Sequence, residues 1–386
     1  MLSNNKRERN ENKQPLTVPV VSLCKAVMRT VFKNIVFLLL SCLLAFSCEQ
    51  KKDKGEYSLP RFKQEFTREF EILGSELDLG LVSSIKTYKD YLILLGQNRW
   101  TKQYLQIIDK KTGEIIHSSA AFGRGPGEVL GPRYLSIIGQ ECYLYDPSSD
   151  VAQVYDLEQI LQGEVGYIRT IRDLDIPPFT VGCFYGPGGR VIFRNETFIQ
   201  REGSQPMPRI ILDLDEAQYT YDGYPVPDRV RSYWMYTQPH LTISPDFSKM
   251  AVAPEYGAIL ERFSLSGGIS LMGVDRFIAP DFAIKDTNPS FSENFPLGFT
   301  SITSTNDKII VGMVGEDLSG LGIREVSELK SPLFPYLAVF DWNGRPLVRV
   351  RNSMNIECLG YDEEEGVVFA VLCNAEDARY LGKMAI

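Results

Sequence analysis

Short β-type runs separated by turns recur along most of the chain, and this repetition constrains the fold more than any other feature. Runs such as DYLILLGQ, ECYLYDP and KIIVGMVG are rich in β-branched and aromatic residues and are bounded by Gly, Pro, Asp and Asn. Two tight turns are explicit, KTGE at Lys111–Glu114 and WNGR at Trp342–Arg345, where glycine can supply positive φ. The pattern predicts an all-β chain from residue 58 onward.

The runs group into repeating units. The spacing of the units varies between about 45 and 60 residues, which fits four strands plus loops of varying length. The first strand of each unit is predicted near Ser83, Tyr134, Thr180, Leu241, Thr300 and Ile356. Four-stranded sheets arranged radially form a β-propeller, so we expect a six-bladed β-propeller over residues 58–386. A pair of β-sandwich domains is the alternative, although no linker-like change in composition divides the body.

The last unit is one strand short, since only three strand-like runs follow its start. Near the beginning of the body, the run REFEILGSELDLG (Arg68–Gly80) offers a strand without a partner. We therefore predict that this N-terminal strand completes the last blade and closes the propeller.

The N-terminus has the features of an export signal. Arg29 and Lys33 precede the apolar run Ile35–Phe46. A run of about 12 residues is too short for a membrane span, which needs about 20, and it matches the apolar core of a signal peptide. The segment from Met28 is by itself a normal signal-peptide start, so Met28 is a possible true start of the protein.

The sequence LLAFSC, ending at Cys48, resembles the lipobox of bacterial lipoproteins. The resemblance implies cleavage before Cys48, acylation of that cysteine, and a membrane anchor of two or three chains. Residues 1–48 would then be the signal peptide and 49–57 a linker. The expected location is the envelope of a Gram-negative-type bacterium, at the outer membrane, on its periplasmic or surface side. An ordinary signal peptide cleaved near Ser47, or an uncleaved anchor, is the alternative.

Charge and cysteine usage narrow the classes of partner. The net charge is -8 without a Lys/Arg stripe, which argues against nucleic acid. The cysteines of the body match no zinc pattern, and no metal or cofactor is expected. We predict that they are buried free thiols; if any pair is bonded, it is Cys358 with Cys373. The four are Cys142, Cys183, Cys358 and Cys373.

The stretch GRGPGE, Gly123–Glu128, followed by a hairpin from Asp146 to Asp156, resembles the signature of the TolB-like six-bladed β-propeller lipoproteins of bacteria. A second match is LTISPDFSKMAV, in which Phe247 stands where glycine is usual. The resemblance implies a fold and a location, and it carries over no general activity.

The glycine-rich loop lacks the spacing of either nucleotide-binding motif. We expect it to cross from the outer strand of one blade to the inner strand of the next. Arg124 and Glu128 either contact a partner there, or pair with each other or with backbone groups to fix the crossing.

Other candidate residues are few. With two histidines, His117 and His240, a catalytic triad or a multi-histidine metal site is nearly excluded. Arg231, Tyr233 and Trp234, together with His240, could stack on sugar rings or a peptide; packing between blades is the alternative. The acidic runs at residues 212–216 and 361–366 are interpreted as solvated charge rather than calcium ligands.

Together these features predict a membrane-anchored lipoprotein whose propeller is a binding module for an envelope protein partner or an extracellular ligand, a glycan or a peptide. A propeller-type carbohydrate-active enzyme, a hydrolase or lyase using carboxylates at the central channel, is the alternative.

Overall fold

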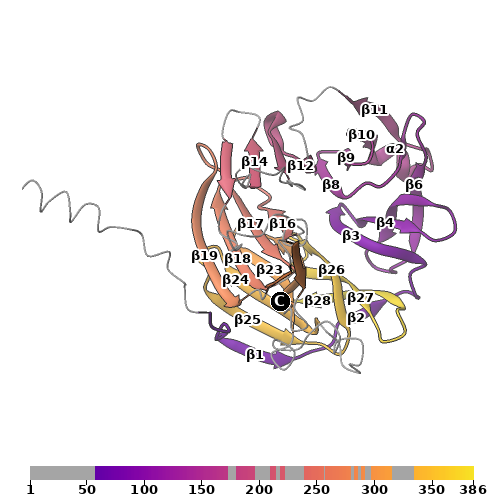
Figure 1. Cartoon of the computed structure of the whole chain (residues 1–386). Helices are drawn as coiled ribbons and strands as arrows, with labels where there is room; N and C mark the ends of the chain where they lie inside the picture. The colour runs from indigo at the N-terminus through magenta and orange to yellow at the C-terminus, as the bar shows by residue number, and fades with distance from the viewer. Residues whose placement is uncertain are drawn as a thin grey trace, which may run out of the picture. The chain divides into compact units, whose positions relative to one another are not determined.

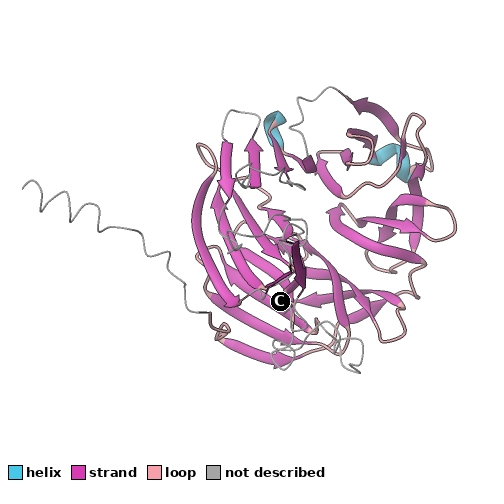
Figure 2. Ribbon diagram, viewed as in Figure 1, coloured by secondary structure: helices cyan, strands magenta, loops and turns pink. Residues whose placement is uncertain are grey.

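Residues Tyr57–Ile386 form one unit, separate from Met1–Glu56. The structure is a computed structural model that describes residues 57–172, 180–195, 209–213, 218–221, 239–255, 257–279, 282–285, 288–291, 297–314 and 334–386. Within these residues, the strands form six sheets of four or five strands and one two-stranded sheet (Figures 1 and 2). The predicted signal segment and Cys48 lie outside the described residues.

The first three sheets follow one another along the chain. The first contains β3 (Leu79–Tyr88), β4 (Tyr91–Asn98), β5 (Gln103–Asp109), β6 (Ile115–Phe122) and β7 (Glu128–Val129). The second contains β8 (Tyr134–Ile138), β9 (Glu141–Asp146), β10 (Val151–Asp156) and β11 (Tyr167–Ile171), with the short helix α2 (Leu157–Leu161) between its last two strands. The third contains β12 (Thr180–Tyr185), β13 (Val191–Asn195), β14 (Arg209–Asp213) and β15 (Gln218–Tyr221).

The remaining sheets include both ends of the body. The fourth contains β16 (Pro239–Ile243), β17 (Lys249–Pro254), β18 (Ala258–Ser264) and β19 (Ser270–Ile278), and is followed by the pair β20 (Phe282–Lys285) and β21 (Asn288–Phe291). The fifth contains β22 (Phe299–Ser304), β23 (Lys308–Met313), β24 (Tyr336–Asp341), β25 (Pro346–Arg351) and β1 (Gln64–Thr67). The last contains β26 (Asn355–Asp362), β27 (Val367–Cys373), β28 (Arg379–Ala385) and β2 (Glu71–Leu73).

Every predicted unit start lies in the first strand of a sheet, namely β3, β8, β12, β16, β22 and β26. The turns explain why the hairpins form where they do. Gly113 and Gly344 have φ of +75° and +81°, which residues with a side chain rarely adopt. The carboxylate of Asp109 accepts hydrogen bonds from the N–H groups of Lys111 and Thr112 at the first of these turns. The predicted tight turns are confirmed.

Apolar side chains pack between each sheet and the next. The buried residues of the described sheets fall into six clusters, and each cluster combines side chains from two successive sheets. One of them joins the last sheet to the first, because Leu79 and Val82 pack with Phe369 and Val371. First strands also contact their neighbours, as β22 does β26 and β26 does β3. The arrangement is an all-β β-propeller.

The N-terminal strand completes the last sheet, as the sequence predicts. β2 pairs antiparallel with β28, with Glu71 opposite Lys383 and Leu73 opposite Leu381. Just before it, the side chain of Phe70 is buried against that sheet. The last sheet is therefore built from both ends of the body.

Four elements, β1, α2, β20 and β21, were not predicted. β1 pairs in parallel with β25 at the edge of the fifth sheet, where Gln64 lies opposite Val348. α2 follows Asp156, whose side chain accepts hydrogen bonds from the N–H groups of Glu158 and Gln159 and so caps the helix. The pair β20 and β21 also adds a small sheet. Among the described residues, no helix is long and apolar enough to cross a membrane.

The structure explains how phenylalanine is tolerated at position 247, where the resembled motif usually has glycine. Phe247 has φ of +58°, the left-handed conformation that favours glycine. Its ring nevertheless gains a partner, since the Arg190 guanidinium lies 5.4 Å from the ring centroid and Arg190 Nη1 donates a hydrogen bond to the Phe247 carbonyl. These contacts with the third sheet offset the strain that a side chain adds to the turn.

Candidate functional site

A central cavity of about 1210 Å³ lies among the described residues. It is lined by residues of the first strand of each sheet, from β3, β8, β12, β16, β22 and β26. Pockets for small molecules are typically ~300–1,000 Å³, so the cavity has room for a small ligand or for a chain segment.

Side-chain hydroxyls in the cavity wall join neighbouring first strands. The Ser136 hydroxyl of β8 accepts a hydrogen bond of 3.1 Å from the N–H of Tyr185 in β12. The Ser301 hydroxyl of β22 accepts one of 2.9 Å from the N–H of Leu359 in β26. The wall is thus held by neutral groups between these sheets, and it presents further hydroxyls to the interior.

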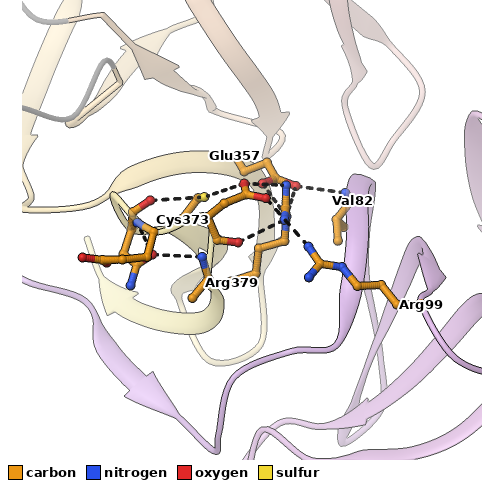
Figure 3. Close-up of polar contacts among 9 residues, drawn as sticks. Val82, Arg99, Glu357, Cys373 and Arg379 are labelled. Atoms are coloured by element: carbon orange, nitrogen blue, oxygen red, sulfur yellow. Dashed lines mark hydrogen bonds and ion pairs between the residues drawn. The ribbon is translucent and has the colours of Figure 1, made fainter. Parts of the chain in front are cut away.

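The junction of the last and first sheets uses charged groups instead (Figure 3). Glu357 of β26 accepts a hydrogen bond of 3.0 Å from the N–H of Val82 in β3. Arg379 Nε donates to both carboxylate oxygens of Glu357, at 3.1 and 2.8 Å. The Glu357 and Arg379 side chains are only 12% and 10% exposed. The Glu357 carboxylate therefore has a structural role at this junction.

The same cluster extends to the turn before β28. The Asp377 carboxylate lies 3.4 Å from Arg379 Nη2 and 3.8 Å from Arg99 Nη2, and Arg99 belongs to the first sheet's β4–β5 turn. Cys373 Sγ lies 3.5 Å from Asp377 Oδ1. Figure 3 shows how these side chains gather beside Val82.

A second ion pair crosses the same junction beyond the other end of β26. Lys110 follows β5 in the first sheet, and Asp362 ends β26 in the last. Lys110 Nζ pairs with Asp362 Oδ2, and the two side chains are only 5% and 3% exposed. Two of the carboxylates that line the cavity, Glu357 and Asp362, are thus neutralised by cations of the fold.

Among the other ionisable side chains that line the cavity are Lys86 of β3 and Glu255 after β17. Burial lowers the pKa of the Lys86 amine, and burial raises the pKa of the Glu255 carboxyl. In the part of the chain that the structure describes, neither side chain has a hydrogen bond or an ion pair. These two groups are therefore available to a ligand.

The glycine-rich loop crosses from the first sheet to the second, as predicted. After β6 the chain pairs in parallel through β7, then enters β8. Glu128 Oε2 accepts a hydrogen bond of 2.6 Å from the N–H of Gly125, and a Cβ at Gly123 would collide with this carboxylate. Glu128 thus holds the loop's own backbone. Arg124 is exposed, and its role in contacting a partner stays a prediction.

The loop also rests on the second sheet, which explains the residues that follow it. Gly127 has φ of +72°, and a Cβ there would lie 2.9 Å from the Tyr167 ring. The Tyr155 hydroxyl donates to the Gly127 carbonyl at 2.9 Å. Asp146 accepts a hydrogen bond of 2.6 Å from the N–H of Leu130. The spacing between the GRGPGE stretch and Asp146 is therefore explained by packing of the glycine-rich loop on the second sheet.

The predicted aromatic face is described only in part. His240 lies in β16 and lines the cavity. Arg231, Tyr233 and Trp234 lie outside the described residues, so the grouping of these three with His240 stays a prediction. The remaining histidine, His117, lies in β6, as expected.

The four cysteines of the body are free. Cys142, Cys183 and Cys358 are buried, as predicted, whereas Cys373 is half-buried. Cys358 and Cys373 lie on the adjacent strands β26 and β27 without a bond between them. Burial raises the pKa of Cys183 and Cys358 to about 12 and that of Cys373 to about 11, so these thiols are neutral near pH 7.

The acidic run at residues 361–366 forms the turn between β26 and β27. Asp362 accepts hydrogen bonds from the N–H groups of Glu364 and Glu365, which explains its place in the turn. Of the run at 212–216, only Leu212 and Asp213 are described, at the end of β14. No group of three His, Cys, Asp or Glu in the described residues is arranged to hold a metal ion.

The sequence did not single out Lys86, Glu255 or Glu357. Lys86 lies in a run, SSIKTY, that was recognised as a first strand. In a propeller the first strands line the centre, so a lysine within such a strand is the signal that could have indicated the site.

Comparison with known proteins gives the fold alone. No family model matches the chain, and no curated protein matches it. Among solved structures, U3-55K has a TM-score of 0.51 at 9% identity, covering 82% of this chain and 98% of that one. The WD40 repeats of RRP9 have a TM-score of 0.48 at 10% identity, covering 82% of this chain and 99% of that one. The gluconolactonase XC5397 from Xanthomonas campestris has a TM-score of 0.44 at 10% identity, covering 80% of this chain and 88% of that one.

Proposed function

We propose that the protein is a six-bladed β-propeller lipoprotein of the TolB-like kind, tethered through Cys48, that binds an envelope partner or an extracellular glycan or peptide. The central cavity carries this proposal, because all six first strands contribute to its lining and leave Lys86 and Glu255 available inside it. The six sheets of four or five strands support the blade count, with β20 and β21 as an addition between two blades.

The tether rests on the lipobox-like LLAFSC, which ends at Cys48. Cys48→Ala in the full-length protein should abolish fatty-acid labelling and release the body from membranes. Cys42→Ala removes a cysteine within the apolar run and should leave labelling intact. Labelling that persists in Cys48→Ala would refute the tether.

Binding in the cavity is tested by filling it. Ser84 of β3 lines the cavity, and Ser84→Trp should remove binding to any glycan or peptide that the full-length protein captures from an array. Ser149→Trp, in an exposed turn, is the matched control and should bind like the parent. Equal binding by both variants, or no binding by the parent, would contradict a ligand site in the cavity.

The predicted aromatic face extends this proposal to a larger partner. Arg231, Tyr233 and Trp234 precede β16, whose His240 lines the cavity. Changing the three to alanine together should weaken capture of an envelope partner. Unchanged capture would remove this face from the proposal.

One observation favours the enzymatic alternative. Glu255 lines the cavity, and burial raises the pKa of its carboxyl, as a general acid requires. In this second candidate function, Glu255 protonates a leaving group of a carbohydrate substrate. Polysaccharide turnover by the parent, lost in Glu255→Gln, would support it. Absence of turnover by the parent would remove it.

A further inference from the structure

We propose that the cavity binds a small hydroxylated carboxylate, a monoanion of the sugar-acid class, and that the carboxylate of this ligand pairs with the Lys86 amine. This inference rests on the proposed binding function of the cavity and assigns the chemical class of its ligand.

Lys86 is a buried amine of the cavity wall that no ion pair compensates, whereas the two carboxylates of the closing junction are paired. Glu357 is neutralised by Arg379, and Asp362 by Lys110. No described residue forms an ion pair with Lys86, which lines the cavity from β3. An anion entering the cavity would therefore find a cation that the fold does not use.

The Cys358 thiol across the junction does not supply a counter-charge to Lys86. Cys358 of β26 lines the same cavity as Lys86, and burial raises the pKa of its thiol to about 12. The thiol is thus neutral near pH 7. Burial without a counter-ion disfavours the charged amine, and a ligand carboxylate would relieve this cost by pairing with it.

The rest of the wall suits a ligand with hydroxyl groups. Ser84 and Thr87 of β3, Thr303 of β22 and Tyr361 of β26 line the same cavity. Hydroxyl groups donate and accept hydrogen bonds, so they complement a polyol. Lys89 and Lys110 of the lining are already paired with carboxylates, and Arg133 is exposed. The buried Lys86 amine balances one negative charge, which favours a carboxylate over a doubly charged phosphate.

Calorimetry with the full-length protein in detergent tests the inference, using D-galacturonate, D-galactose and inorganic phosphate as probes. Galacturonate should bind at least ten-fold more tightly than galactose or phosphate. Lys86→Met should reduce galacturonate affinity at least ten-fold, and Lys86→Arg should restore part of it. Lys111→Met removes an exposed lysine of the β5–β6 turn and should bind like the parent.

A second measurement does not depend on a variant that folds. An amine-reactive reagent, mapped by peptide mass, should modify Lys86 several-fold more slowly when galacturonate is present, and Lys111 at an unchanged rate.

Three results would overturn the inference. Equal affinity for galactose and galacturonate, with no effect of Lys86→Met, would leave a cavity that binds neutral sugars. Phosphate binding tighter than galacturonate would assign a different anion. No binding of any probe, with Lys86 modified equally fast throughout, would remove the site. The Ser84→Trp array test can still succeed in each case, so failure of this inference is separable from failure of the proposed function.

Discussion

At two junctions in the wall of the cavity, a side chain accepts a hydrogen bond from a backbone N–H of the neighbouring sheet, but the accepting groups differ. Between the fifth and last sheets, the neutral hydroxyl of Ser301 accepts the hydrogen bond from Leu359. Between the last and first sheets, the Glu357 carboxylate accepts it from Val82, and the buried pair of Lys110 and Asp362 crosses nearby. Of these two junctions, only the one at which the propeller closes contains buried ion pairs.

The composition of the last sheet suggests why its junction with the first sheet contains buried charges. The fifth sheet's first four strands follow one another in sequence, whereas the last sheet joins β2 from the N-terminal end to β28 at the C-terminal end. That seam has three paired positions, of which Ile72 and Gly382 are the central ones. A short seam specifies its register weakly, and buried charge pairs demand a precise geometry. We infer that the charges of this junction hold the first sheet against the last.

The largest expected effect comes from removing the seam. Deleting residues 57–79 takes away β1 and β2 together with the buried side chains of Phe70, Leu73 and Leu77. Each such side chain contributes about 1.5–3 kcal/mol when buried, and a domain's total stability is only about 5–15 kcal/mol. The cooperative thermal transition, followed by circular dichroism, should be lost. A truncated protein that melts like the parent would show that the seam does not close the fold.

The next largest effect should follow from breaking the buried pair. Lys110→Met leaves Asp362 buried without its cation, which should lower the free energy of unfolding by about 3–5 kcal/mol. Arg169→Met is the control, because Arg169 and Glu141 form a pair whose side chains are 45% and 30% exposed. The control should lose less than about 1 kcal/mol in urea unfolding. Equal losses of unfolding free energy in Lys110→Met and Arg169→Met would contradict a special role of the closing junction.

A smaller effect is expected at the neutral junction. Ser301→Ala leaves the buried N–H of Leu359 without its acceptor, which should cost about 1–3 kcal/mol. Ser149→Ala, in an exposed turn, should change the stability by less than about 0.5 kcal/mol. If Ser301→Ala destabilises the protein more than Lys110→Met in the same urea titrations, the contrast between the two junctions is reversed.

The smallest effect concerns pH and a charge pair remote from the closure. Hydrogen bonds from Arg169 and Tyr143 hold the pKa of Glu141 at about 2, below its usual 4.5. A depressed carboxyl stabilises the fold above its unfolded pKa, and this stabilisation is lost as pH falls from about 4.5 to about 2. The stability difference between the parent and Glu141→Gln should therefore shrink over that interval. A difference that is constant with pH would contradict the assignment.

The sequence predicted features that are local. All six first strands, the Gly113 and Gly344 turns and the pairing of the N-terminal strand were found, because strand runs, turn residues and a missing strand are visible in a single chain. Side-chain pairing across sheets was not found. Val82 and Glu357 are separated by 275 positions, and no spacing rule connects them. The parallel pairing of β1 with β25 likewise depends on an edge that exists only in the folded protein.

The candidate site was predicted less well than the fold. Glu128 was singled out with two alternatives, and the structure shows the one in which it bonds backbone, to Gly125. Lys86 was missed because a lone lysine in a strand resembles a solvent-exposed residue. Its place in the cavity depends on the radial arrangement of the sheets.

The most direct test of charge-based closure is a double-mutant cycle on Lys110→Met and Asp362→Asn, measured by urea unfolding. The two residues come from the first and last sheets, so their coupling energy measures the junction itself. Our account predicts that the double variant is more stable than the sum of the single losses implies, by at least about 2 kcal/mol. Single losses that add to within about 0.5 kcal/mol would contradict it.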